Sequence, residues 1–218
     1  MAELRAADAR NAAAVRVVVL QGADGHFCAG GDLNWMKAQM TAKPAARAAE
    51  AKTLAMMLQA LNTMPKPLIG AVNGAAFGGG IGLISVCDVA IAAEKAKFGL
   101  TETTLAIIPG AGGTQRLPRL IGKSRAKDLI LTGRRIGVEE AHSIGLVNRI
   151  APAGELRETA LAVAAEIAGN GPVAVRAAKA AIDDGCEAPL PQGLEIEARC
   201  YERVLPTQDR LEALAAFA

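Results

Sequence analysis

The sequence Gly70-Ala-Val-Asn-Gly-Ala-Ala-Phe-Gly-Gly-Gly-Ile-Gly82 places three consecutive glycines between two apolar segments. The first segment predicts a short buried strand over 68–72, and the second can begin a helix at Gly79. Because glycine has no side chain, an oxygen atom of a ligand can approach the peptide N–H groups of such a turn directly. The stretch therefore predicts a strand–turn–helix unit whose backbone can hold a partial negative charge.

Two further glycine-rich segments flank this unit, Cys28-Ala-Gly-Gly-Asp32 before it and Pro109-Gly-Ala-Gly-Gly-Thr-Gln115 after it. A single carboxylate, Glu102, precedes the second segment in an otherwise uncharged run. A carboxylate removed from water has a raised pKa and can transfer protons. The pattern predicts an oxyanion held by peptide N–H groups beside one acid. Tight turns for the glycines and a surface position for Glu102 remain the alternatives.

Strands that alternate with helices predict an α/β core, followed by a helical region. Residues 2–13 suggest the end of a surface helix, and residues 23–34 a loop. The predicted strands are 15–20, which is expected to be buried, 68–72, 88–93 and 147–150. The predicted helices are 44–62, one from Gly79, two short ones within 114–131, and 155–168, 172–184, 190–203 and 207–217.

The composition limits the class of protein. The chain has 218 residues, enough for one domain with a helical appendage, and its net charge of +2 argues against nucleic-acid binding. Its four cysteines show no paired spacing, which is typical of a reduced, cytoplasmic protein. The longest apolar run, 81–93, contains Asp88 and is too short to span a bilayer, so no membrane association is predicted.

Several common sites are not supported by the spacing of the motifs. A dinucleotide-binding motif needs a third glycine three residues after a Gly-x-Gly pair. Leu83 stands at that position after Gly78-x-Gly80, and Gln115 stands there after Gly110-x-Gly112. No phosphate-binding loop with Gly-Lys-Ser/Thr and no Gly-x-Ser-x-Gly motif is present. The two histidines, His26 and His142, have no metal-ligand spacing, so no metal site is predicted. His26 lies close to Cys28 in the sequence, but a histidine in a loop is more often solvated than part of a catalytic pair.

With these motifs the sequence resembles the crotonase superfamily, the enoyl-CoA hydratase/isomerase family, over almost its whole length. Residues 171–179 and 197–214 are most similar to methylglutaconyl-CoA hydratases. The motifs that carry the resemblance are 27–33, 67–80, Cys87-Asp88, 97–102, 108–117, 131–133 and 141–147.

The resemblance implies a crotonase-like spiral of ββα units over residues 1–154 and a helical C-terminal trimerisation region over residues 155–218. It implies a homotrimer, or a hexamer built as a dimer of trimers. The substrate would be an acyl-CoA, with coenzyme A present only as part of the thioester and with no metal. A first hairpin and a basic C-terminal tail, usual in the family, are absent from this sequence.

The resemblance also implies a site. The N–H groups of Gly31 and Gly79 would form the oxyanion hole for the thioester oxygen, and Glu102 would transfer a proton at the substrate carbon. Contacts with the substrate would come from Ala29, Asp32 and Gly110, of which Gly110 helps to hold the water.

One departure from the family pattern bears on the reaction. Hydratases with two glutamates carry the other glutamate at the position of Gly82. The overall similarity predicts a hydratase of a short or branched 2-enoyl-CoA, as in the breakdown of fatty acids or branched amino acids. The alternatives are a one-glutamate enoyl-CoA isomerase, favoured by Gly82, and a degenerate CoA-binding member with weak catalysis. An RNA-binding protein is disfavoured by the balanced charge and the 3% of aromatic residues.

Overall fold

A parallel sheet is built around two apolar runs, β2 (Leu68–Val72) and β4 (Val89–Ala93). Every residue of β2 is buried, which is typical of a strand covered on both faces. The strand order is β1-β2-β4-β7, with β1 at Val18–Gln21 and β7 at Arg149–Ala151. Ile69 lies opposite Val89 in the parallel register of β2 and β4. The computed structural model describes residues 14–110, 112–152 and 154–217.

A second sheet has the order β3-β5-β6 and is made of three-residue strands. These are β3 (Ala75–Phe77), β5 (Lys97–Gly99) and β6 (Arg135–Gly137). The pairing of β3 with β5 is parallel, and that of β5 with β6 is antiparallel. Since β3 follows β2 after two residues, this sheet places the end of β3 directly before the glycine turn at Gly78.

At two places in the core a pair of strands is followed by a helical segment, as the ββα spiral requires. The order β2-β3-α3 is repeated as β4-β5-η1-α4, where η1 is a single 3₁₀ turn. This arrangement confirms the predicted α/β core. The helices are α1 (Leu33–Thr41), α2 (Pro44–Asn62), α3 (Gly79–Ile84), η1 (Glu102–Leu105), α4 (Gly113–Ile121), α5 (Lys123–Thr132) and α6 (Val138–Ser143).

The hydrophobic core brings side chains of both sheets together with those of α3, α4 and α5. Phe98, Ile81 and Leu117 are at most 1% exposed and belong to this cluster. Truncation of a buried phenylalanine to alanine typically costs about 3–5 kcal/mol, so the three-residue strand β5 contributes strongly through Phe98. The core thus fixes the end of β3 and the start of α3, which carry the glycine turn.

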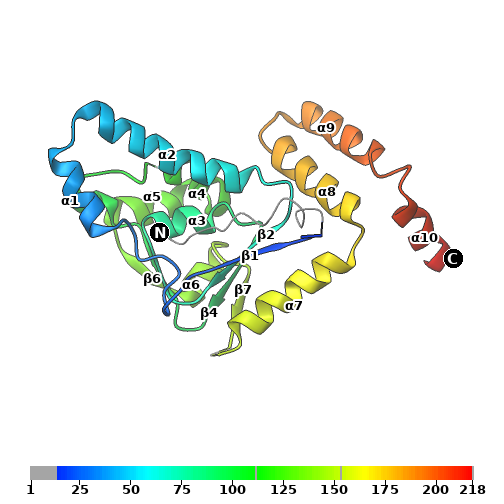
Figure 1. Ribbon diagram of the computed structural model, residues 1–218, viewed down its shortest axis with the longest axis horizontal. Helices are drawn as coiled ribbons and strands as arrows, with labels where there is room; N and C mark the ends of the chain where they lie inside the picture. Colours follow the sequence, from blue (N-terminus) through cyan, green and yellow to red (C-terminus); the bar gives the residue numbers. More distant parts are fainter. Residues whose placement is uncertain (1–13, 111, 153, 218) are drawn as a thin grey trace. The chain divides into compact units, whose positions relative to one another are not determined.

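The C-terminal part of the chain is helical, as predicted. Its helices are α7 (Leu156–Gly169), α8 (Pro172–Gly185), α9 (Leu190–Glu202) and α10 (Gln208–Phe217). Figure 1 shows α8 and α9 side by side, and a Cβ atom on Gly193 would lie 3.0 Å from the carbonyl oxygen of Gly185. The absence of side chains at this crossing therefore lets the two helices approach closely.

The described residues form two compact units. One contains residues 19–64 and 68–161, and the other contains residues 14–18, 65–67 and 162–217. The domain division predicted at residues 154 and 155, and the role of the helical region in trimerisation, stay predictions.

Three predicted elements differ from the structure by more than one residue at an end. The first strand is Val18–Gln21 instead of 15–20, and its residues are half-buried or exposed instead of buried. The loop predicted over 23–34 ends earlier, because Asp32 caps a helix that begins at Leu33. The last strand is Arg149–Ala151 instead of 147–150. The helix end predicted over 2–13 lies outside the described residues.

Candidate active site

The loop before α1 is held to the turn between β2 and β3 by an amide side chain. Asn73 accepts a hydrogen bond from the N–H of Gly22 at 3.2 Å and donates one to the carbonyl of Gly22 at 3.0 Å. A Cβ atom on Gly74 would lie 2.1 Å from the carbonyl oxygen of Gly25, so only glycine permits this approach. Two of the three glycine-rich segments, which are far apart in the sequence, are thereby brought together.

This contact continues toward the predicted oxyanion hole. Cys28 forms a parallel bridge with Ala76, and the N–H of Phe77 donates to the carbonyl of Cys28 at 2.9 Å. A Cβ atom on Gly80 would lie 2.7 Å from the same carbonyl oxygen. The segment that leads to Gly31 therefore runs directly beside the segment that leads to Gly79.

In the described part of the chain, the backbone N–H groups of Gly31 and Gly79 have no hydrogen-bond acceptor. Gly79 is the first residue of α3, where the backbone N–H has no acceptor within the helix. Across residues 14–110, 112–152 and 154–217, neither amide donates a hydrogen bond in a turn or loop. Gly31 is exposed and Gly79 is half-buried. Both N–H groups can therefore donate to a ligand.

Glu102 lies against the glycine turn. Its Oε1 atom is 3.1 Å from the position that a Cβ atom would take on Gly78, the residue before Gly79. Its Oε2 atom is buried and, among the described residues, is the one buried side-chain oxygen or nitrogen without a hydrogen-bond partner. Gly78 has φ 52° and ψ −114°, a conformation that glycine adopts without strain. The turn thus admits the carboxyl group because Gly78 has no side chain.

Burial raises the pKa of Glu102 above its ordinary value of 4.5, and a hydrogen bond to its own backbone lowers it in part. The surface position considered for this glutamate is therefore wrong, because the side chain is half-buried. A carboxyl group with a raised pKa holds a proton more readily, which suits a group that must both accept and return one.

Gly82 is buried in α3, and the neighbouring side chain comes from α2. A Cβ atom on Gly82 would lie 3.4 Å from the Cδ1 atom of Leu58, which is 1% exposed. An aliphatic methyl group therefore lies in contact with the position where a side chain on Gly82 would begin. Sequence reasoning missed Leu58, because its helical spacing in α2 does not distinguish it from any other apolar residue of the helix.

The residues predicted to contact the substrate have different surroundings. Asp32 caps α1, since its Oδ1 atom accepts a hydrogen bond from the N–H of Trp35 at 2.8 Å. Ala29 is exposed in the loop before it. Gly110 is exposed between η1 and α4, in the segment that follows Glu102. The roles of Ala29, Asp32 and Gly110 in substrate binding stay predictions.

A cation–π contact supports the end of β3, and no pattern in the sequence indicates it. The guanidinium of Arg135 lies 5.0 Å from the centre of the Phe77 ring. The same ring packs on Gly99, where a Cβ atom would lie 3.2 Å from its Cδ1 atom. The N–H of Gly78 donates to the carbonyl of Gly99 at 2.9 Å. These contacts fix the residues directly before Gly79.

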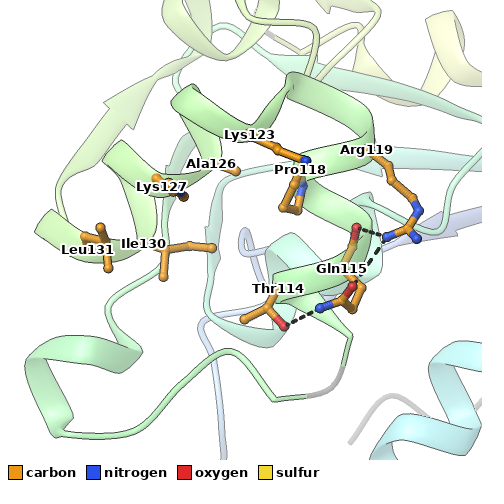
Figure 2. A pocket seen from close by; sticks show the side chains of 9 residues that line it. All are labelled: Thr114, Gln115, Pro118, Arg119, Lys123, Ala126, Lys127, Ile130 and Leu131. Carbon is orange, nitrogen blue, oxygen red and sulfur yellow. Dashed lines mark hydrogen bonds between the residues drawn. The ribbon is translucent and has the colours of Figure 1, made fainter.

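The other possible sites among the described residues do not bring several of the predicted functional residues together. No group of three or more histidine, cysteine or acidic side chains in this part could hold a metal ion. His26 is exposed. A cleft of about 660 Å³ lies on α4 and α5, and Figure 2 shows Arg119, Lys123 and Lys127 around it. None of the predicted site residues lines this cleft, so it is separate from the candidate site.

Comparison with known proteins gives a consistent result. A family model described as enoyl-CoA hydratase/isomerase matches residues 2–218. A probable mitochondrial enoyl-CoA hydratase 2 of Arabidopsis thaliana is 48% identical over 204 residues, covering 93% of this chain and 67% of the relative. The human mitochondrial methylglutaconyl-CoA hydratase is 42% identical over 208 residues, covering 93% of this chain and 60% of the relative.

Solved structures share the same fold. The crystal structure of an enoyl-CoA hydratase from Bacillus anthracis is 51% identical and has a TM-score of 0.88. The match covers 93% of this chain and 78% of that chain. A second enoyl-CoA hydratase, from a Polaromonas species, is 34% identical with a TM-score of 0.90 and covers 95% of this chain and 80% of that chain. The predicted crotonase-like fold is thereby confirmed.

Proposed function

The chain belongs to the enoyl-CoA hydratase/isomerase family of the crotonase superfamily, and we propose that it hydrates a short or branched 2-enoyl-CoA. The thioester oxygen binds the N–H groups of Gly31 and Gly79, and Glu102 transfers the proton. Coenzyme A enters only as part of the substrate. The observation that carries this proposal is the Glu102 carboxyl group against Gly78, the residue that precedes Gly79 in the chain, with Oε2 buried and, among the described residues, without a hydrogen-bond partner.

The two amides act on the charge that develops during the reaction. Attack of water at C3 of the enoyl group moves electrons to the thioester oxygen, which becomes an enolate. Fixed N–H donors stabilise this charge more than they stabilise the neutral carbonyl, and loss of one such donor typically costs about 3–4 kcal/mol. The start of α3 supplies one of these donors at a helix N-terminus, where negative charge is favoured.

A single carboxyl group can complete the addition of water in two steps. The Glu102 carboxylate takes a proton from water as the oxygen forms its bond to C3. The protonated Glu102 then gives the same proton to C2 as the enolate collapses, and the product is a 3-hydroxyacyl-CoA. The raised pKa of Glu102 supports this sequence, because the protonated form must persist until the second step.

An enoyl-CoA isomerase is the second candidate, and the surroundings of Gly82 favour it. A double-bond shift from C3 to C2 needs one group that removes a proton from C2 and returns it to C4. Among the described residues, the neighbour within 4 Å of a Cβ atom on Gly82 is the Cδ1 atom of Leu58, an aliphatic group that cannot bind the attacking water as a second carboxylate would. The Glu102 carboxylate alone is sufficient for the shift.

The assembly and the location of the protein are also proposals. We infer a homotrimer or hexamer formed through the helical region 155–218, whose exposed apolar side chains support an interface. We propose a reducing, cytoplasmic location, which is supported by four cysteines that form no disulfide in the described chain. The Arabidopsis and human relatives are named as mitochondrial. Among the described residues, no helix has the length and apolar character needed to cross a membrane.

The substitution Glu102→Gln tests the proposed mechanism. It keeps the size of the side chain and removes the proton transfer, so turnover falls by about 10²–10⁴-fold. Calorimetric titration with a saturated acyl-CoA of matched chain length then gives an affinity within about threefold of the wild type, because the amides of the oxyanion hole remain. Full turnover by Glu102→Gln would remove Glu102 from the mechanism.

Parallel assays separate the two candidate reactions. The wild-type protein is supplied with a 2-enoyl-CoA in water and, separately, with a 3-enoyl-CoA, and the products are identified by mass and by chromatography. Formation of a 3-hydroxyacyl-CoA from the first substrate supports hydration. Conversion of the second substrate alone assigns the isomerase instead. Tight binding of acyl-CoA without turnover of either substrate would identify a degenerate CoA-binding protein.

A further inference from the structure

The guanidinium of Arg116 joins two elements that border the candidate site. Its Nε atom donates to Oδ1 of Asn62 at 3.1 Å, and its Nη2 atom donates to Oε1 of Gln59 at 2.8 Å. Both acceptors lie in the last turns of α2, whereas Arg116 belongs to the first turns of α4. Hydrogen bonds from a charged donor are stronger than neutral ones, so this pair of bonds ties α4 to the end of α2.

Arg116 also lies directly on the glycine that begins α4. A Cβ atom on Gly112 would be 2.1 Å from Nη1 of Arg116 and 3.0 Å from its Cζ atom. Gly112 has φ 87°, and its carbonyl accepts the backbone N–H of Arg116 at 2.8 Å. The side chain therefore folds back over its own helix start before it reaches α2, and it covers the turn that follows Gly110.

The segment between Glu102 and Gly112 is buried at Pro109, but three of its apolar side chains are exposed. Leu105, Ile107 and Ile108 are 58%, 51% and 68% exposed. At its start, the hydroxyl of Thr103 donates to the carbonyl of Ile130 at 2.6 Å. Arg116 supplies the corresponding anchor at its end. A segment that is exposed over most of its length depends on such anchors to hold a single conformation.

We propose that Arg116 is a positioning residue for the reaction: it clamps the start of α4 at Gly112 to α2 and so fixes Gly110 relative to Glu102. The inference rests on the proposed function, since it assigns the clamp to the loop of that same site. The end of α2 also carries Leu58, which packs beside Gly82. The clamp therefore sets the distance between the loop on one side of the site and the α2 side chain on the other.

The substitution Arg116→Ala tests the clamp, and Arg119→Ala is its matched control. Arg119 lies one turn further along α4, and it donates hydrogen bonds to the backbone carbonyl and to the side-chain oxygen of Gln115 in the same helix. Arg116→Ala lowers kcat by about 10–100-fold while the affinity for a saturated acyl-CoA changes less than about threefold, because misplacement of groups by about 1 Å has effects of this size. Arg119→Ala leaves kcat within about twofold of the wild type.

The acceptor variant Gln59→Ala/Asn62→Ala gives a second measure that does not alter the arginine. If the clamp acts through these amides, the triple variant with Arg116→Ala loses no more kcat than Arg116→Ala alone, within about twofold. Fully multiplicative losses would overturn the proposal. So would an unchanged kcat in Arg116→Ala, or a loss of stability with normal kcat per folded molecule.

Amide hydrogen exchange separates the clamp from the proposed function. In the ligand-free protein, exchange of the backbone amides of residues 106–108 and 110 accelerates about tenfold or more in Arg116→Ala and is unchanged in Arg119→Ala. This readout needs no turnover, so it tests the clamp even if the wild type converts neither enoyl-CoA. Equal exchange in both variants would contradict the proposed role of Arg116 and would not affect the assignment of Glu102.

Discussion

Glu102 has two carboxyl oxygens in different surroundings, and this difference determines how it titrates. Oε1 faces the open side of Gly78, whereas Oε2 is buried without a partner. A buried acceptor that lacks a hydrogen bond disfavours the charged form, because water can no longer solvate it. Among the described residues, such a buried side-chain atom without a partner occurs at Glu102 alone, and Glu102 is the residue proposed to receive the proton.

The raised pKa of Glu102 predicts the pH dependence of both activity and stability. Because the carboxylate is the starting form of the base, kcat falls as the pH drops through a pKa above 4.5. For stability the sign is opposite to that of an ion-paired acid. The folded state binds the proton more tightly than the unfolded state, so stability is greatest below 4.5 and decreases as the pH rises through the folded pKa.

Thermal unfolding tests the predicted direction in which stability changes with pH. At about pH 8 the variant Glu102→Gln melts about 2 °C above the wild type, a shift expected from less than about 1 kcal/mol in a domain of this size. At about pH 4 the difference shrinks, since the wild-type carboxyl group is then neutral. A wild type that gains stability over Glu102→Gln as the pH rises would contradict the burial of the carboxylate.

A substitution at Gly78 separates the effect of backbone strain from the effect of contact with the Glu102 carboxyl group. Gly78→Ala places a methyl group 3.1 Å from Oε1 of Glu102 at a φ of 52°. Gly145→Ala has a similar positive φ of 84° but no atom within 4 Å of the added Cβ. Both lose about 1–2 kcal/mol of stability from strain. Only Gly78→Ala also loses turnover, by about tenfold or more, which steady-state kinetics measures.

At the scale of the element, the start of α1 decides between two roles for Asp32. Asp32→Ala removes the hydrogen bond to the N–H of Trp35 and costs about 1 kcal/mol in urea unfolding, whereas Asp32→Asn keeps the cap and costs little. If Asp32 also binds the substrate through its charge, Asp32→Asn weakens acyl-CoA affinity without loss of stability. Equal affinity in Asp32→Asn and the wild type limits Asp32 to the cap.

Elements with a clear pattern could be predicted from the sequence. The predicted bounds of α2 and β2, 44–62 and 68–72, are those of the structure, because prolines and a fully apolar run mark them. The strands β3, β5 and β6 were missed, since three residues are too few to show a period of two. Helix α1 was missed because its cap, Asp32, stands in a glycine-rich run that is typical of a loop.

The candidate site was predicted only in part for a related reason. The glycine clusters and Glu102 are visible in the sequence, because unusual residue types mark a backbone conformation or an isolated charge. Leu58 and Arg116 are ordinary residues of helices, and their importance comes from contacts 24 and 54 residues away. Such long-range contacts follow from the packing of α2 beside α3 and α4, which no local pattern encodes.

At the scale of the whole molecule, α9 has an apolar stripe without a partner in the described chain. Leu190, Leu194 and Tyr201 are 75%, 55% and 60% exposed and are spaced by four and seven residues, so they share one face of the helix. Gly193 and Cys200 belong to the adjacent face, where Gly193 packs on α8. A surface of this kind on a helix is typical of contact with another protein chain.

The predicted trimer or hexamer assigns that stripe to contact between subunits, and one pair of variants tests it. Leu194→Glu places a charge within the stripe, and Gln192→Glu places the same charge on α9 away from the stripe. By light scattering after size exclusion, the wild type and Gln192→Glu have a mass three or six times 22.4 kDa. Leu194→Glu has a smaller mass at micromolar concentration, because a buried unpaired carboxylate opposes association. A single-subunit mass for the wild type would leave the stripe to a different partner, and an intact assembly in Leu194→Glu would exclude it from the subunit interface.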